Sequence, residues 1–275
     1  MEASLFSKLL ALFFVTQALG LLVGIDLVKK INAGEIEQPR ILTENPEDVE
    51  NALGLFLYII IFTGAILLAI RFVKGILLFR VLEALAIFAA SFIVFDAFFP
   101  DASLMFAILL LLLRIVLRES IWLRNASSII AVAGVGALIG VSLGLLPVLI
   151  FIVLLASYDI IAVFWTKHMV VLAKHLAKRN LAFTYALPTK KHTFELGTGD
   201  MVIPLAFSVS VLREGFVLGF PNYLFTPLLI LFGSLVGLIV TLEYSSRNVG
   251  RALPALPPQT VIMIAMLAVG KALGF

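Results

Sequence analysis

The sequence predicts an all-α integral membrane protein with nine transmembrane helices. Hydrophobic residues make up 62% of the 275 residues, the mean hydropathy is +1.14, and only 13% of the residues are charged. Soluble domains carry about 25% charged residues, so this composition excludes an ordinary soluble fold. Apolar residues gather in stretches close to the roughly 20 residues that cross a bilayer core. We expect one membrane domain over residues 1–275, with spans at approximately 5–28, 52–70, 81–99, 102–117, 127–144, 147–166, 200–218, 223–242 and 256–273.

Short polar or charged segments separate the first five spans. Span 5–28 is too long for the apolar region of a signal peptide, so we expect it to be retained. The acidic segment 29–50 contains prolines and is the only long hydrophilic stretch of the first half, which predicts a solvated loop. A charged segment that includes Arg124 precedes the fifth span. This span is rich in small residues, which let a neighbouring helix approach closely in lipid: Ala133, Gly136, Ala137 and Gly140.

The last four spans are joined by segments of distinct composition. The sixth span carries Asp159, and a basic linker at 167–191 connects it to a span that begins close to Asp200. The eighth span leads to the proline-rich run 254–258, which we expect to be irregular because proline lacks the N–H that a helix interior requires. Backbone carbonyls freed in this way can pair with an extended peptide.

Basic residues predict the orientation. With nine spans, one side of the membrane receives the N-terminus and the loops near 71–80, 114–124, 167–191 and 243–251, and this side holds fifteen of the 20 Lys and Arg residues. Because Lys and Arg are enriched in cytoplasmic loops, we expect a cytoplasmic N-terminus and an extracytoplasmic C-terminus. We therefore attribute the net positive charge to loops at the surface of the lipid bilayer and expect no nucleic-acid partner.

Most of the acidic residues lie in loops or near the ends of spans. Asp26, Glu83, Asp96 and Glu195 are close enough to an interface that we expect their carboxylates to reach water. Asp159 and Asp200 differ, because each lies within or at the start of a long apolar run. An acid inside a span costs about 2.5–3.5 kcal/mol to insert, so these two residues require an explanation.

Three explanations fit two intramembrane acids. They can be structural groups that hydrogen-bond a neighbouring helix, an ion site of a proton or cation transporter or channel, or a pair that hydrolyses peptide bonds. Ion transport is the commonest use of such acids. Hydrolysis would require the two carboxylates to share one proton, so that one activates water while the other polarises the scissile carbonyl. A pair of this kind titrates as a unit, so the two roles cannot be assigned to individual residues.

Three motifs together resemble the presenilin and signal peptide peptidase family, the GxGD intramembrane aspartyl proteases. They are Tyr158-Asp159 in the sixth span, Leu196-Gly197-Thr198-Gly199-Asp200 at the seventh, and Pro254-Ala255-Leu256 before the ninth. The resemblance implies a presenilin-like fold and an intramembrane aspartic endopeptidase. It implies catalysis by Asp159 and Asp200 and an active site shaped by the other motif residues: Tyr158, Gly197, Thr198, Gly199, Pro254, Ala255 and Leu256.

The predicted orientation matches the presenilin branch, whose substrates are type I transmembrane proteins. The linker 167–191 lacks the long loop in which presenilin cleaves itself, so we expect one uncleaved chain. The small size resembles microbial homologues that act without accessory subunits, alone or as a homo-oligomer. No cofactor is expected.

Other classes of enzyme lack their motifs here. The chain has no Cys, which disfavours a prepilin peptidase, and it has no His-Glu-x-x-His sequence for a metalloprotease. A rhomboid protease would require a buried His within a span, and none of the three His residues lies in one. His168, His175 and His192 fall in the basic linker without metal-ligand spacing, so no metal is expected. Transport through the two acids stays as the alternative function.

Overall fold

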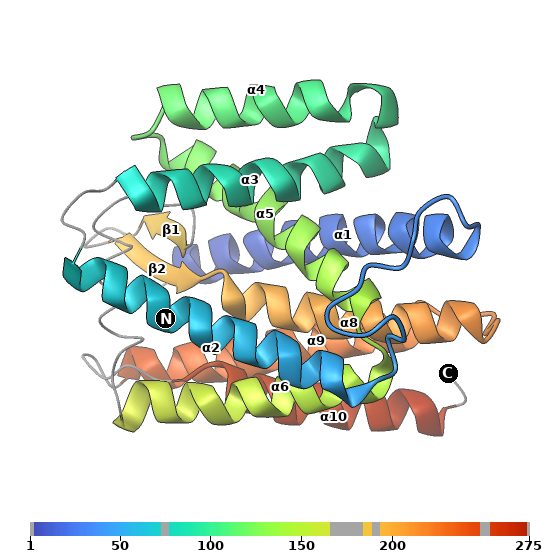
Figure 1. Ribbon diagram of the computed structural model, residues 1–275. Helices are drawn as coiled ribbons and strands as arrows, with labels where there is room; N and C mark the ends of the chain where they lie inside the picture. Colours follow the sequence, from blue (N-terminus) through green and yellow to red (C-terminus); the bar gives the residue numbers. More distant parts are fainter. Residues whose placement is uncertain (1–2, 73–76, 166–183, 189–192, 248–253, 274–275) are drawn as a thin grey trace.

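The computed structural model describes residues 3–72, 77–165, 184–188, 193–247 and 254–273 of the chain. Within these ranges the fold is helical, with one β-hairpin, and it is an all-α membrane fold as predicted (Figure 1). The α-helices are α1 Ala3–Asn32, α2 Val49–Phe72, α3 Leu77–Phe98, α4 Ser103–Val116, α5 Ile121–Ser142, α6 Leu145–Ile160, α8 Gly199–Val217, α9 Phe225–Arg247 and α10 Leu256–Ala272. A 3₁₀ turn (Pro100–Ala102) precedes α4, and a π-helical turn (Ile161–Trp165) follows α6.

Each predicted span overlaps one of these helices, although several boundaries differ. Among the helices of the described ranges, six are long and apolar enough to cross a membrane, namely α1, α2, α3, α5, α6 with its π-helical turn, and α9. Helix α10 is shorter, at 17 residues. Helix α8 has 19 residues but carries three charged ones, Asp200, Arg213 and Glu214.

The helices form a bundle with α8 near its centre. Figure 1 shows α3 and α4 on one side, α1, α5 and α8 in the middle, and α2, α6, α9 and α10 on the other side. Helix α5 crosses the bundle obliquely and packs against α1, α3 and α8. Helix α9 packs along α10 and α8, whereas α2 contacts mainly α6 and is largely exposed.

Glycines on two helices hold α8 closely. A Cβ added at Gly136 or Gly140 of α5 would lie 2.6 Å from a side-chain carbon of Leu205 or Val209, respectively. On α1, a Cβ at Gly24 would also lie 2.6 Å from Val209. The small residues of the fifth span therefore make the close helix contact that the sequence predicts, and the helix that packs against them is α8.

Two sequence expectations about element boundaries are wrong. Helix α5 begins at Ile121 rather than at 127, because Ser120 caps it by accepting a hydrogen bond from the Leu123 N–H (3.3 Å). The run 254–258 is not entirely irregular, since α10 begins at Leu256 and includes two of the prolines. The first N–H groups of a helix have no partner inside it, so proline is tolerated there.

A β-hairpin occupies part of the region expected to be linker. Strand β1 (Thr184–Pro188) pairs antiparallel with β2 (Thr193–Gly197), with Thr184 opposite Gly197 and Ala186 opposite Glu195. Strand β2 therefore ends inside the Gly197-Thr198-Gly199-Asp200 motif. The remainder of the linker, including His168, His175 and His192, lies outside the described residues.

Candidate active site

Asp159 lies in the last turn of α6, where the helix changes to a π-helical turn. The neighbouring Tyr158 is half-buried, and its ring packs edge-on against Phe56 of α2, with the ring centres 6.1 Å apart. Tyr158 thus joins α6 to α2. The Asp159 side chain is half-buried and approaches α10.

The Pro254-Ala255-Leu256 motif meets Asp159 through its backbone. The Leu256 N–H donates a hydrogen bond to Asp159 Oδ2 at 3.3 Å, and Ala255 is the N-cap residue of α10. The unpaired N–H groups and the positive end of the dipole at a helix start favour an anion. The start of α10 therefore stabilises a carboxylate at Asp159, which explains how a motif 97 residues away acts on it.

Asp200 is the second residue of α8. Its carboxylate leans toward the glycine before the helix, since a Cβ added at Gly197 would lie 3.5 Å from Asp200 Oδ2. Thr198 is the N-cap residue, and its carbonyl accepts the N–H groups of Met201 and Val202, each at 3.0 Å. Gly199 is exposed, and a Cβ there would meet no atom within 4 Å. The motif therefore leaves an open approach beside Asp200.

The two aspartates come together although they lie on different helices. Asp159 is near enough to Asp200 for their charges to repel each other, and the side chain of Asp200 is also half-buried. Two carboxylates that share a site do not both ionise readily, which is the property that a hydrolytic pair requires. The three sequence motifs thus converge at one end of α6, α8 and α10.

A buried arginine holds the hairpin next to Asp200. Arg124 of α5 is 3% exposed; its Nε donates to the Thr184 carbonyl (3.1 Å) and its Nη1 to Glu195 Oε1 (3.3 Å). Arg124 Nη2 also bonds both Thr184 Oγ1 and Glu195 Oε2, and the threonine hydroxyl donates to the same carboxylate oxygen at 2.7 Å. We refer to Arg124, Thr184 and Glu195 as the hairpin clamp.

Other residues of α5 extend this attachment. Asn125 exchanges two hydrogen bonds of 2.8 Å with the backbone of Ala186, and the Tyr185 hydroxyl reaches the Ser128 carbonyl at 3.4 Å. Burial raises the pKa of the Tyr185 phenol, an effect only partly offset by its hydrogen bond with Thr16, so the hydroxyl stays neutral. Strand β1 is therefore fixed to α5, and β2 carries this attachment to the motif.

Several of these residues were missed or misplaced from the sequence. Glu195 does not simply face water, because it pairs with Arg124, and Glu83 is buried with Arg114 of α4 at 2.9 Å. Asp26 and Asp96 both pair with Lys30, at 2.9 and 2.8 Å. Ser120 is the signal in the sequence that indicates the earlier start of α5, because serine is a common N-cap residue. The β-branched and aromatic residues around Tyr185 are the signal that indicates the hairpin.

Gln17 supports α8 from α1 and was also missed. It is buried, and its Nε2 donates to the carbonyl of Met201, the residue after Asp200, at 3.0 Å. That carbonyl lies in the first turn of α8, near Pro204, which lacks the N–H that would bond the carbonyl of Asp200. A lone glutamine in an apolar span was the signal for this contact.

Comparisons with known proteins agree with this geometry. A family model described as signal-peptide peptidase, presenilin aspartyl protease, matches residues 10–271. Two crystal forms of a presenilin family intramembrane aspartate protease, in space groups C222 and P2, are similar in structure. The first has a TM-score of 0.65 and 22% identity over 96% of both chains. The second has a TM-score of 0.63 and 28% identity, covering 94% of this chain and 97% of the other.

No curated protein matches the sequence. The family model nevertheless covers nearly the whole chain, and the structural neighbours share its arrangement of helices throughout. This favours hydrolysis over transport as the use of the intramembrane acids. The chain belongs to the signal-peptide peptidase and presenilin family, and it is an intramembrane aspartyl protease.

Proposed function

We propose that Asp159 and Asp200 form the catalytic dyad, which hydrolyses peptide bonds within transmembrane helices of type I membrane proteins. The observation that carries this proposal is the meeting of the two aspartates, with the Leu256 N–H on one of them. Family membership supplies the reaction class, and the described geometry supplies two carboxylates that can share one proton.

The reaction uses one water molecule and no other reagent. The ionised carboxylate accepts a proton from water, and the water oxygen attacks the scissile carbonyl carbon. At the same time the protonated carboxylic acid donates its proton to the carbonyl oxygen. The tetrahedral intermediate then collapses: the carboxylic acid formed in the first step donates its proton to the amide nitrogen as the C–N bond breaks. The other carboxylate accepts a proton from a hydroxyl of the intermediate, which restores the starting state of the dyad. The dyad acts as a unit, so either aspartate can begin as the base.

The substrate must lose helical structure before it can be cleaved. A transmembrane helix satisfies its own backbone groups, so unwinding it requires new hydrogen-bond partners. The open side at Gly199 and the non-helical residues Pro254 and Ala255 provide space and backbone groups beside the proposed dyad. Gly197 and Thr198 are half-buried next to this opening. We propose that these residues, with Leu256 and Tyr158, contact the unwound segment.

The orientation of the protease in the membrane determines whether type I or type II transmembrane substrates run through the active site in the direction that permits cleavage. In the topology predicted from the sequence, fifteen of the 20 basic residues fall on the side of the N-terminus. Figure 1 shows α1 beginning at one end of the bundle and α10 ending at the other. Both observations support a cytoplasmic N-terminus and an extracytoplasmic C-terminus, and hence type I substrates. We propose that the purified chain acts without accessory subunits.

The test is cleavage of a type I transmembrane substrate by the purified protein in detergent. We expect Asp159→Asn and Asp200→Asn each to lower activity by about 10³-fold or more, because groups that act as a unit fail together. Asp101→Asn removes an exposed acid before α4 and serves as the matched control with unchanged activity. An aspartyl-protease transition-state analogue should block the parent enzyme.

Two outcomes would contradict the proposal. Activity retained by either dyad variant would show that the carboxylate is not essential. Absence of cleavage, together with proton or cation flux in proteoliposomes that both substitutions abolish, would identify an ion pathway instead.

A further inference from the structure

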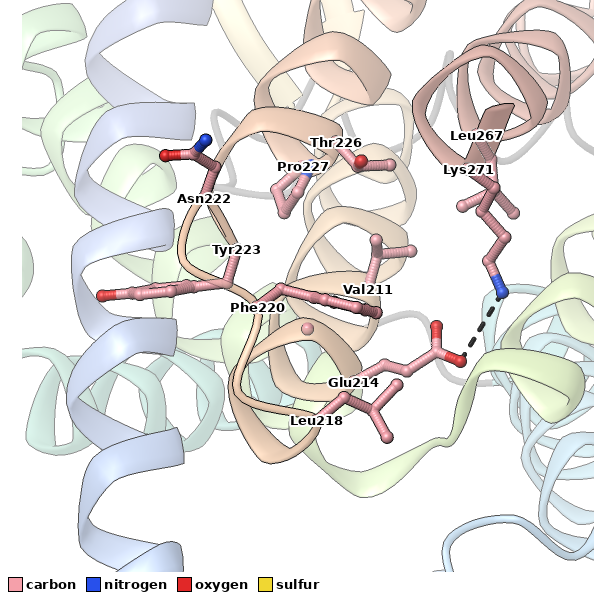
Figure 2. A pocket seen from close by; sticks show the side chains of 11 residues that line it. Val211, Glu214, Leu218, Phe220, Asn222, Tyr223, Thr226, Pro227, Leu267 and Lys271 are labelled. Atoms are coloured by element: carbon pink, nitrogen blue, oxygen red, sulfur yellow. Dashed lines mark ion pairs between the residues drawn. The ribbon is translucent and has the colours of Figure 1, made fainter. Parts of the chain in front are cut away.

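A pocket of about 270 Å³ lies at the end of α8, α9 and α10 that faces away from Asp200 (Figure 2). Its walls include Val211, Phe220 and Leu267, and its polar groups include Glu214, Thr226 and Lys271. Asp200 and Glu214 are fourteen residues apart on α8, which places them about 21 Å apart along the helix. The pocket is therefore separate from the candidate active site.

A loose ion pair forms one wall of the pocket. Glu214 Oε1 and Lys271 Nζ are 3.6 Å apart, and their side chains are 32% and 49% exposed (Figure 2). This separation exceeds the roughly 2.7–3.2 Å of a direct hydrogen bond. An ammonium has three donors and a carboxylate has several acceptor positions, so each group can bind a ligand while the other stays nearby.

A buried hydroxyl forms a second polar point. Thr226 is 3% exposed and lines the pocket, yet its Oγ1 has no hydrogen-bond partner among the described residues. Buried polar side-chain atoms are almost always hydrogen-bonded, to protein or to ordered small molecules. The hydroxyl lies beside Gly270 of α10 and is available to a polar ligand atom that enters the pocket.

We propose that this pocket binds the head group of an aminophospholipid, with an aminoethyl phosphate. Lys271 takes the phosphate, Glu214 takes the primary ammonium, and Thr226 bonds an oxygen near the glycerol. Opposite charges side by side on the protein match opposite charges side by side on the ligand. The volume equals that of about nine water molecules, at about 30 Å³ each, which is sufficient for such a head group.

The surroundings indicate a lipid with a primary ammonium. Val217 and Leu218 are highly exposed at the end of α8, so acyl chains can lie against them. A quaternary ammonium is best bound by several aromatic faces. The Tyr223 ring instead packs edge-on against Phe216, with the ring centres 5.5 Å apart, and Figure 2 shows it directed away from Lys271. Of the two aromatic residues that line the pocket, Phe220 is therefore the one whose ring a quaternary ammonium could contact.

The test measures lipid retention by the purified full chain, without substrate, using native mass spectrometry. The probes are phosphatidylethanolamine, phosphatidylcholine and phosphatidylglycerol with identical acyl chains. We expect one phosphatidylethanolamine to be retained about tenfold more strongly than the other two, as suits a charge-assisted contact to each partner. Glu214→Gln and Lys271→Met should each remove this preference, and Thr226→Val should weaken it. Lys29→Met, an exposed lysine at the end of α1, is the matched control with the preference unchanged.

The parent protein alone can overturn the proposal, whatever the folding of the variants. Equal retention of the three lipids, or a preference that survives both charge substitutions, would show that the pocket does not select an aminoethyl phosphate. Thermal stabilisation by free phosphoethanolamine, without retention of phosphatidylethanolamine, would overturn the lipid as its source. Since no cleavage is measured, these results do not depend on the proposed dyad.

Discussion

At the scale of single residues, the contact between α10 and Asp159 is a backbone contact. The Leu256 N–H, not its side chain, reaches the carboxylate at 3.3 Å. Side-chain substitutions in this motif therefore test packing and substrate contact, while the effect on the acid comes from backbone N–H groups, of which that of Leu256 makes the hydrogen bond described above. The two contributions can be separated chemically.

Replacing the amide of Leu256 by an ester removes this hydrogen and keeps the side chain. We expect kcat/KM to fall by about ten- to a hundredfold, because a hydrogen bond to a charged group contributes about 1.5–3 kcal/mol. The measurement is cleavage by protein carrying the α-hydroxy acid analogue of leucine at this position. Leu256→Ala keeps the N–H and serves as the comparison. If the ester had full activity, the backbone contact would be irrelevant to catalysis.

At the scale of elements, α8 is positioned by helix packing on one side and by the hairpin clamp at its start. The clamp joins Arg124 to two strands that lie about 60–70 residues later in the sequence, as the hydrogen bonds to Thr184 and Glu195 show. Neither strand is long enough to be stable alone. The position of Asp200 therefore depends on a polar contact between distant segments.

A double-mutant cycle measures the clamp. Arg124→Gln leaves Glu195 partly buried without its cation, so we expect a loss of about 2–3 kcal/mol in the free energy of unfolding. Glu195→Gln added to this variant should recover part of the loss, since the unpaired charge is removed. Unfolding in mild detergent gives both values. Strictly additive effects of the two substitutions would show that the pair is not coupled.

The glycine contacts of α8 can be tested with a matched pair of substitutions. In Gly140→Ala the new methyl would lie 2.6 Å from Val209 Cβ and 2.7 Å from the Ala206 carbonyl oxygen, so we expect destabilisation by about 1–3 kcal/mol. Gly64→Ala on α2 meets no atom within 4 Å and should be neutral or slightly stabilising. Thermal unfolding distinguishes them, and equal midpoints would contradict the packing described here.

The sequence predicts helices well and polar contacts poorly, for a physical reason. A membrane span requires a continuous apolar stretch, and such a stretch can be recognised from neighbouring residues in the sequence, as around Asp159. The charge of Arg124 predicts a loop before residue 127, whereas α5 includes this residue because Glu195 pairs with it inside the protein. The convergence of Asp159, Asp200 and Leu256 came from family resemblance, since no local pattern shows which helices are neighbours.

At the scale of the whole molecule, orientation is the property with the widest consequences. Because the chain contains no Cys, single cysteines can be introduced without removing others. We expect Glu119→Cys to react with a membrane-impermeant thiol reagent only after the cytoplasmic side is opened, and Glu35→Cys to react in intact cells. Both positions are exposed. The reverse labelling pattern would reverse the orientation and predict type II substrates.

The close contacts of α8 with α1 and α5 also determine which parts of the bundle can move. Helix α8 cannot slide or rotate without meeting the glycine positions, whereas α6 is attached to the weakly anchored α2 and contacts α8 less extensively. We therefore expect α8, which carries Asp200, to move less than α6, which carries Asp159. Admission of a substrate on the α2–α6 side would change the separation of the two carboxylates, so we expect the enzyme to assemble its dyad anew in each turnover.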